Sequence, residues 1–456
     1  MFRKISNASV KLVNNFLPDA FIFCIVLTIV VFILAMPAAH ANPLQVIGFW
    51  GNNVWSLLAF SMQMALVVVT GSAMAAAPAV KRVLSAIAGI PKTPGSAIAI
   101  TTFVSCICMW VNWGFGLVAG ALLAKEVARK VQGVDYRLLM ASAYSSIVIW
   151  HAGISGSIPL QIASVNETVT AQTAGVITES IPLSPTILAP WNLCMCAFIA
   201  IVMPFLNAKM HPAPEDTITV DPKLLVVEEE EVYNPKTIAE RLECSRILAW
   251  FVVVIGVIYL VQYFKSSGSI LNSLSLNIVN LIFLLAGIAL HGTPIKYVKA
   301  VGKAAAGSAG VILQFPFYAG IMGMMTGHLP DSTASLAGVI SNFFVSISTR
   351  ITFPLWTFLS AGIVNFFVPS GGGQWAVQAP IVLPSAQRIG TSYAVACMGI
   401  VWGDQWTNLL QPFWALPALA IAGLGARDII GYCLIDLIFT GIVAVVGFII
   451  VGMMGF

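Results

Sequence analysis

Long apolar runs alternate with short polar connections along most of the chain. No Asp, Glu, Lys or Arg occurs from Ala20 to Val80, and another charge-free stretch runs from Ile351 to Gln387. A helix needs about 20 apolar residues to cross a bilayer, and several of these runs are longer. The alternation of apolar and polar residues typical of a membrane β-barrel is absent. Because helices satisfy their own backbone hydrogen bonds in lipid, the pattern predicts an all-α integral membrane protein.

The basic residues predict which connections face the cytoplasm, because short cytoplasmic loops carry most of the Lys and Arg of a membrane protein. Arg3, Lys4 and Lys11 place the N-terminus inside, and the connection 37–53 has no Lys or Arg and is expected outside. A basic group that starts at Lys81 then returns the chain to the cytoplasm. The first apolar run lacks a convincing cleavage site, so we interpret it as a retained helix.

Two charge-free stretches are predicted to form re-entrant hairpins, which enter and leave the membrane on the same side. The stretch 93–124 has basic residues near both ends, and it is too long for one crossing and too short for two of about 20 residues each. We place this hairpin at about 96–124, with its tip in "VNWGFG" (111–116). The second hairpin is predicted at about 351–387, where "PSGGG" (369–373) interrupts the helix because proline lacks a donor and glycine weakens helices.

Two further crossings are interrupted by glycine, proline and polar residues. The first, at about 138–164, contains "WHAGISGSIP" (150–159), and the second, at about 391–423, contains "GDQWTNLLQP" (403–412). Irregular backbone at membrane depth is tolerated only where protein or a watery cavity supplies hydrogen bonds. The hairpins and broken helices are therefore expected to meet at the bilayer midplane around a solute.

The same order of elements recurs in the two halves of the chain. Residues 1–206 are predicted to hold two helices, the first hairpin, the first broken helix and a closing helix. Residues 207–246 form a hydrophilic cytoplasmic linker, and residues 247–456 hold an extra helix followed by the second set. Because the extra crossing makes the count odd, the second half is expected upside down, as in the inverted repeats of secondary transporters.

Composition agrees with a membrane protein and excludes several functions. The chain of 456 residues is 59% hydrophobic and 9% charged, against about 25% charged in soluble proteins. The net charge of +4 is not gathered into a basic arm with aromatic residues, which argues against nucleic acid as a partner. No Walker loop is present, so an ion gradient is the expected energy source, and no cofactor is expected beyond a coupling ion such as Na⁺.

Small and polar residues at the predicted tips and interruptions are the candidates for solute contact. Half-helix N-termini offer N–H groups to an anion, and glycine allows the backbone to approach it closely. A single hydroxyl or amide often only bridges packed helices, so the grouping beside helix-breaking residues carries the prediction. The candidate substrate-binding residues are Asn112, Trp113, Gly114, Ser155, Ser157, Gly371, Gly372, Gly373, Gln374, Thr407 and Asn408.

Asp404 and His151 are the candidate ion-coupling residues. A carboxylate within the membrane is costly and usually functional, and a histidine can change its charge near neutral pH. Each has a structural alternative, in which Asp404 fixes the unwound segment and His151 bonds a carbonyl group. Asp436 is placed close to a helix end and is interpreted as interfacial.

Arg350 and Arg388 flank the second hairpin on the side expected to face outward. They could attract an anion, or they could extend to lipid headgroups, and the sequence leaves both roles open. A tight turn between two full crossings is the alternative to this hairpin. It needs about 20 residues on each side of the glycine triplet, more than the stretch contains.

Four stretches resemble the bacterial short-chain fatty acid transporter (AtoE) family: "MWVNWGFGLVAGALLAKEVAR" (109–129), "WHAGISGSIPL" (150–160), "FVPSGGGQWAVQAP" (367–380) and "WGDQWTNLLQPFWALP" (402–417). That family is grouped with the ion-transporter superfamily. The resemblance covers nearly the whole chain and implies a scaffold domain, a transport domain that moves like an elevator, homodimers, uptake of butyrate or acetoacetate, and coupling to Na⁺ or H⁺. "NWG" and "SGGG" stand where the dicarboxylate branch has its paired Ser-Asn-Thr signature, which favours a substrate with one carboxylate.

Together these features predict a symporter that carries a small monocarboxylate across the bacterial inner membrane, with the lipid bilayer and a second copy of the chain as partners. A cation/proton antiporter that uses Asp404 and His151 is the alternative within transport. An intramembrane enzyme is a third hypothesis, which would need a nucleophile–base pair or a metal cluster. The five histidines are scattered without metal-ligand spacing.

Overall fold

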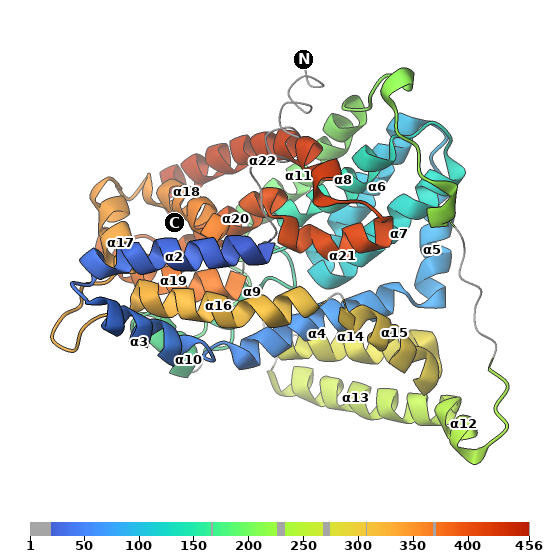
Figure 1. The fold of residues 1–456 in the computed structure, drawn as a ribbon, viewed down its shortest axis with the longest axis horizontal. Coiled ribbons are helices and arrows are strands. Elements are labelled where there is room, and N and C mark those ends of the chain that lie inside the picture. Colours follow the sequence, from blue (N-terminus) through green and yellow to red (C-terminus); the bar gives the residue numbers. More distant parts are fainter. Residues whose placement is uncertain are drawn as a thin grey trace.

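Helices make up every regular element in the part of the chain that the structure describes (Figure 1). The computed structural model describes residues 20–165, 167–225, 233–267, 274–306, 308–367 and 371–455. The predicted all-α fold is confirmed for these residues. The described helices that are long and apolar enough to cross a membrane are α6 (Pro94–Val111), α11 (Pro190–Lys209), α13 (Arg246–Ser267) and α22 (Ala426–Met454).

One group of helices occupies the lower part of Figure 1, and we call it the lower layer. In it α4 (Leu58–Ala75) packs against α14 (Leu276–His291) and α15 (Pro294–Ala306). α16 (Ala309–Thr326) packs against α4, α2 (Ala20–Ala38) and α3 (Pro43–Asn53). α13 lies at the edge beside α14, and because only 11% of its most apolar window is buried, its outer surface is available to lipid or to another protein.

The second group, the upper layer, contains the predicted hairpins and interruptions and lies mostly in the upper part of Figure 1, although α19 overlaps the lower layer in this view. In it α6 packs against α7 (Trp113–Lys130) and α11, and α18 (Phe353–Phe367) packs against α20 (Tyr393–Thr407) and α22. Two of its helices contact the lower layer, because α7 packs on α4 and α19 (Gly371–Ile389) packs on α16. The two layers therefore meet along one arm of each hairpin.

The first hairpin turns at Asn112, between α6 and α7. Asn112 is extended, with φ −155° and ψ 122°, and its side-chain oxygen accepts a hydrogen bond from the N–H of Phe115 at 2.9 Å, so it caps α7. The arms are antiparallel and very close, since a Cβ on Gly116 would lie 2.5 Å from the Cα of Met109. α6 also has the length of a full crossing.

The second hairpin joins α18 to α19. Residues 368–370, which include the proline of the predicted tip, lie outside the described residues. The glycine triplet that follows is the first turn of α19 rather than an irregular loop. The side-chain amide of Gln374 donates to the carbonyl oxygen of Ala361 at 2.8 Å, which ties the start of α19 to α18.

Both interrupted crossings contain a short 3-10 turn. α8 (Tyr136–Ser145) leads into η1 (Ser146–Ile149), and irregular residues follow before α9 (Ser157–Ile162). In the other crossing α20 gives way to η5 (Asn408–Leu410) and then to α21 (Pro412–Ala422).

The second interruption is shorter in the structure than the sequence pattern 403–412 indicates, because α20 continues to Thr407. Gly403 lies inside this helix, where its missing side chain allows contact with α18. A Cβ on Gly403 would lie 2.3 Å from the carbonyl oxygen of Phe358. This glycine therefore serves close helix packing rather than a helix break.

The order of the helices repeats along the chain. α2, α3, α4, α5 (Pro78–Ala88), the α6–α7 hairpin, α8–η1–α9 and α11 correspond in order to α14, α15, α16, α17 (Leu336–Ser346), the α18–α19 hairpin, α20–η5–α21 and α22. α10 (Glu167–Gln172) is an added short helix in the first set, and α13 lies between the two sets.

Part of the hydrophilic segment that follows α11 packs against the upper layer. The buried carboxylate of Asp135 accepts hydrogen bonds from the N–H of Leu138 at 2.8 Å and of Ile218 at 2.9 Å. The N–H of Tyr136 donates to the carbonyl oxygen of Ile218 at 2.8 Å. This stretch is thus fixed to the start of α8, whereas a purely solvated linker would make no such contacts.

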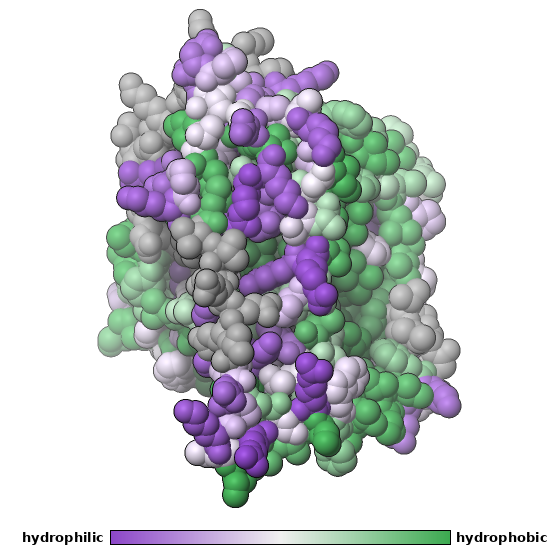
Figure 2. Space-filling view, turned by 90° about the vertical axis from the view of Figure 1, so that its right-hand side faces the viewer, coloured by the Kyte–Doolittle hydropathy of each residue, from purple (hydrophilic) through white to green (hydrophobic). Residues whose placement is uncertain are grey.

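Figure 2 views the end of the molecule that carries α5 and α12 (Ile238–Glu243). Hydrophilic residues gather over the middle of this face, and hydrophobic residues lie along its right-hand margin. The exposed Lys81 and Arg82 of α5 belong to this end. It is the end that the distribution of basic residues predicts to face the cytoplasm.

Candidate functional site

A buried histidine joins the two interrupted crossings. Nδ1 of His151, which lies after η1, is 2.6 Å from Oδ2 of Asp404 in α20, although 253 positions separate the two residues along the chain. Nε2 of His151 accepts a hydrogen bond from the N–H of Ile158 at 3.1 Å and lies 2.9 Å from the hydroxyl of Ser157. Since Nε2 accepts from a backbone donor, the ring proton is assigned to Nδ1, which donates to Asp404.

Gln405 adds a second connection between the same segments. Its Oε1 accepts hydrogen bonds from the N–H groups of His151 and Ala152, both at 3.0 Å. From the other side, the hydroxyl of Tyr144 in α8 donates to the carbonyl oxygen of Asn408 at 2.7 Å. All five residues are buried. The two interruptions therefore face each other and satisfy each other's free backbone groups.

The first hairpin docks its tip on the first interruption. The N–H of Trp113 donates to the hydroxyl of Ser155 at 3.0 Å, and the N–H of Ile154 donates to the carbonyl oxygen of Trp110 at 2.8 Å. A Cβ on Gly153 would lie 2.2 Å from that same carbonyl oxygen. Only glycine allows this approach, which brings the tip beside His151.

The second hairpin docks on the second interruption through one amide. Nδ2 of Asn365, near the end of α18, lies 2.8 Å from each of three oxygens: the carbonyl oxygen of Asp404, Oγ1 of Thr407 and Oδ1 of Asn408. An amide group has two N–H donors, so at most two of the three are bonded at one time. Thr407 and Asn408 thus hold the hairpin in place as well as lying in the site.

Gly371 brings the start of α19 onto the histidine. A Cβ at this position would lie 2.5 Å from Oγ of Ser157 and 2.6 Å from Cε1 of His151. Gly372 and Gly373 are buried in the same helical turn. The beginning of α19 is the positive end of a helix dipole, a place that suits an anion.

The structure places most of the predicted site residues in this group and moves one away from it. Asn112, Trp113, Ser155, Ser157 and the residues of both interruptions lie on the segments that meet at His151. Gly114 instead faces the lower layer, because its Cβ would lie 2.4 Å from the carbonyl oxygen of Val67 in α4. The side-chain oxygen of Asn112 also lies on that side, 3.2 Å from where a Cβ on Gly71 of α4 would be. Both residues therefore take part in the close contact between the layers.

Several buried polar atoms on these segments have no hydrogen-bond partner among the described residues. Three are amide nitrogens: Nδ2 of Asn112, Nε2 of Gln405 and Nδ2 of Asn408. Three are oxygens: Oδ1 of Asp404, Oδ1 of Asn365 and Oε1 of Gln374. Buried polar atoms in native proteins are almost always bonded to protein, water or ligand. Free N–H donors suit a carboxylate, and free oxygens suit a proton or a cation.

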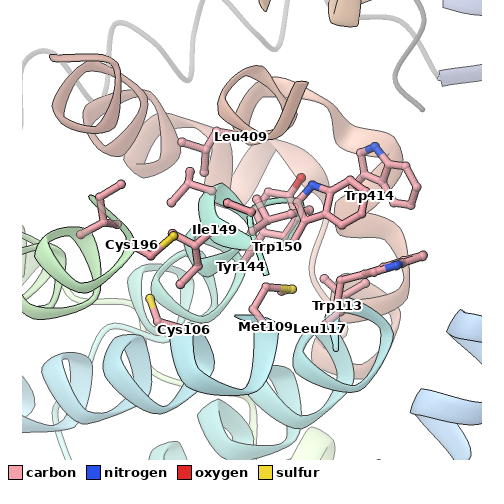
Figure 3. Packing of buried hydrophobic residues seen from close by; sticks show 14 of the residues in the cluster. Cys106, Met109, Trp113, Leu117, Tyr144, Ile149, Trp150, Cys196, Leu409 and Trp414 are labelled. Carbon is pink, nitrogen blue, oxygen red and sulfur yellow. The ribbon is translucent and has the colours of Figure 1, made fainter. Parts of the chain in front are cut away.

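Aromatic side chains cover one side of this polar group. Figure 3 shows Trp113, Trp150 and Trp414 next to one another, from the first hairpin tip, the first interruption and α21. The ring centroids of Trp113 and Trp414 are 5.1 Å apart, and Trp150 stacks on His151 at 4.2 Å. An amphipathic solute would find an apolar wall here beside the polar atoms.

A cavity of ≈ 40 Å³ lies between α16, α17 and the second hairpin. Apolar side chains line most of it, and Thr357, Ser360 and Gln378 add polar groups. Gln378 also accepts a hydrogen bond from the amide of Gln374 at 2.8 Å, so the cavity begins one helical turn from the predicted site. This volume holds a few water molecules, given about 10–15 Å³ for one.

Gln405 and Asn365 contact the candidate site, but the sequence pattern did not single them out. Asn365 lies in an apolar run and Gln405 lies in the segment 403–412, and an amide in either place often only bridges packed helices. The available signal was that both amides lie in or next to a helix-interrupting segment. Asp436 was interpreted as interfacial, but α22 begins at Ala426, and Asp436 is fully buried. Arg350 and Arg388 are exposed, and Arg350 donates to the carbonyl oxygen of Gly455 at 3.0 Å.

Comparison with known proteins identifies the family. Residues 1–451 match the family model described as "Short chain fatty acid transporter". The chain belongs to the short-chain fatty acid transporter family. It is 43% identical over 450 residues to an Escherichia coli (strain K12) protein named "Putative short-chain fatty acid transporter", covering 98% of this chain and 99% of that protein. A Haemophilus influenzae protein of the same name is 42% identical over 455 residues, with the same coverage.

A solved structure supports the fold of this short-chain fatty acid transporter family member. The YdaH transporter of Alcanivorax borkumensis superposes with a TM-score of 0.52 at 15% identity, covering 94% of this chain and 98% of that one. The transporter family and the two relatives also bear on the enzyme hypothesis, because they are transporters and not enzymes. Hydrogen-bond contacts join Ser157, His151 and Asp404 in the order of a hydrolase triad. Nε2 of His151, however, already accepts the N–H of Ile158, so it is not free to act as the base for the Ser157 hydroxyl.

Proposed function

We propose that this protein is a secondary active transporter that carries butyrate, acetoacetate or a similar small monocarboxylate across the bacterial inner membrane in symport with H⁺ or Na⁺. The observation that carries the proposal is the bond between His151 and Asp404, which joins the two interrupted crossings at one buried polar group. Unused amide donors and an aromatic wall surround that group. The printed names of the two relatives give the substrate class.

The carboxylate of the solute is placed against the free amide donors. Nδ2 of Asn112, Nε2 of Gln405 and Nδ2 of Asn408 would then gain an acceptor, and the N-terminal end of α19 would add a favourable dipole. The short acyl chain would lie against Trp113 and Trp414. A solute with a single carboxylate needs no fixed cation in the site, and the described part of the site has none.

The coupling ion is placed at Asp404 and His151. Oδ1 of Asp404 is buried and has no partner among the described residues, so it can take a proton or join a Na⁺ site. The same pair would serve the alternative, a cation/proton antiporter. That alternative predicts ion flux driven by a pH gradient with no organic solute present.

The motion proposed is an elevator-like shift of the upper layer against the lower layer. The repeated helix order supports an inverted repeat, since α13 makes the number of crossings between the two sets odd. The homodimer expected from the family resemblance would use the lower layer, and the exposed apolar surface of α13 is available for it. The N-terminus is placed in the cytoplasm.

Uptake of labelled butyrate by purified protein in liposomes tests the proposal. We expect accumulation beyond that of protein-free liposomes, which a pH or Na⁺ gradient drives and which collapsing the gradient abolishes. Asn408→Leu should abolish uptake, whereas Asn280→Leu, which removes a buried amide in the lower layer, should retain it. Equal uptake by Asn408→Leu and the unchanged protein would remove this site, and no accumulation of any monocarboxylate under either gradient would overturn the function.

A further inference from the structure

A further buried carboxylate, besides those of Asp135 and Asp404, lies in the upper layer on a different helix from the Asp404–His151 pair. Asp436 is in α22, ten residues after its first residue, and is 0% exposed. Neither of its carboxylate oxygens has a hydrogen-bond partner among the described residues. Its backbone carbonyl is occupied, because the hydroxyl of Thr440 donates to it at 2.7 Å. The side chain alone is therefore left without a partner.

Polar side chains from two other helices surround this carboxylate. Ser145, the last residue of α8, and Asn207 in α11 face it. The amide nitrogen of Asn207 donates to the hydroxyl of Thr102 in α6 at 3.3 Å, which leaves Oδ1 of Asn207 without a partner. Residues of α6, α8 and α11 thus enclose the acid of α22.

Charged groups are kept away from Asp436. The titratable groups that face it are the thiols of Cys433 on its own helix and Cys106 on α6. The helices packed around it carry three charged residues, and none of them pairs with it: Arg137 bonds Asp135, Lys209 is exposed and Asp404 bonds His151. An ionised carboxylate without a partner is very costly in such a place, so a neutral acid is favoured here.

The surrounding backbone favours a proton over a metal cation as the occupant. The helices α6, α11 and α22 are continuous past this point, and their carbonyl groups are used by helical hydrogen bonds. A Na⁺ ion would therefore find few oxygen ligands apart from side chains. A proton needs only the carboxylate, and the neutral acid that results needs no cationic partner.

α8 connects this acid to the solute site. Tyr144 donates to the carbonyl oxygen of Asn408 in the second interruption, and the next residue, Ser145, faces Asp436. α22 itself packs against η5, which begins at Asn408. If solute binding moves the second interruption, α8 and α22 would therefore shift the residues around Asp436.

We propose that Asp436 takes up and releases a proton of its own in each transport cycle, in addition to the ion at Asp404 and His151. The inference rests on the proposed symport. The carboxylate gains a proton from water on one side, crosses as the neutral acid and returns it to water on the other side. One coupled ion cancels the charge of the monocarboxylate, so this additional proton moves one net positive charge.

The experiment measures how an imposed membrane potential changes butyrate accumulation in liposomes. One net charge is worth about 2.3 kcal/mol per 100 mV, which corresponds to an accumulation about 50-fold higher at about 100 mV, inside negative. We expect this gain in the unchanged protein and in Asp436→Glu. Asp436→Asn should lose the gain but keep butyrate exchange in the absence of gradients. Passive entry of the neutral acid does not respond to the potential, so it does not imitate the effect.

Asp428→Asn on the same helix is the matched control, because Asp428 is partly exposed and only caps the start of α22. It should respond to the potential like the unchanged protein. Equal responses of Asp436→Asn and the unchanged protein, with exchange intact, would overturn the second proton while leaving the transporter function in place. If no monocarboxylate is transported at all, the proposed function fails separately. Infrared spectroscopy then tests Asp436 independently of transport. The second proton requires a band of a protonated carboxyl group that titrates in the unchanged protein and is absent from Asp436→Asn.

Discussion

The clearest prediction concerns the two ends of the Gln405 side chain, which have different tasks. Oε1 accepts the N–H groups of His151 and Ala152, whereas Nε2 has no partner among the described residues. Gln405→Leu removes both ends. Gln405→Glu keeps oxygen acceptors for the two N–H groups but removes the amide donor. The two variants therefore separate stability from solute binding.

The magnitudes follow from the hydrogen bonds. Gln405→Leu leaves two buried backbone N–H groups unpaired, and each costs about 1–3 kcal/mol, so the loss is about 2–6 kcal/mol. Gln405→Glu should have a melting temperature much closer to that of the unchanged protein. This variant lacks the N–H that would donate to the charged carboxylate of butyrate, and such a hydrogen bond is worth about 1.5–3 kcal/mol. Butyrate should therefore bind about 10- to 150-fold more weakly.

Thermal melting in detergent and butyrate binding to the purified variants provide the two readouts. If Gln405→Leu has the same melting temperature as the unchanged protein, the bridging role of Oε1 is contradicted. A Gln405→Glu protein that binds butyrate as tightly as the unchanged protein would contradict the assignment of Nε2 to the solute.

Two glycine substitutions test the close contacts of the hairpins. Gly371→Ala should displace the start of α19 from Ser157 and His151, cost about 1–3 kcal/mol and reduce uptake, as melting and liposome assays would measure; unchanged uptake would argue against this contact. Gly114→Ala should press on the backbone of α4 at Val67 and impair transport while leaving the affinity for butyrate nearly intact. A strong loss of binding affinity in that variant would instead place Gly114 in the solute site.

Local patterns predicted the first tip and the two interruptions because these depend on residues close together in sequence. "NWG" marked the turn at Asn112, and the helix-breaking residues of 150–159 marked the segment after η1. The same reasoning misplaced the start of the second interruption, because a glycine such as Gly403 is as useful for helix packing as for ending a helix. It also placed Asp436 near a helix end, since the first turn of α22 contains charged residues and resembles a loop.

Contacts between distant segments could be anticipated only from the repeated order of the elements. Asp404 and His151 were both candidates, yet their direct bond depends on how the two halves pack. Gln405 and Asn365 escaped notice for the same reason, because their partners lie on other helices. The direction in which Gly114 faces is likewise set by α4, which the residues around the tip do not reveal.

The central claim is that the two halves of the chain build one solute site through His151 and Asp404. A double-mutant cycle on butyrate binding tests it most directly, with His151→Gln, Asp404→Asn and the combined variant. Because the two side chains touch, we expect the losses of binding free energy to be non-additive by about 1 kcal/mol or more, so that the combined variant binds at least about 5-fold more tightly than the sum predicts. Strictly additive losses, or binding that neither substitution alters, would contradict a shared site.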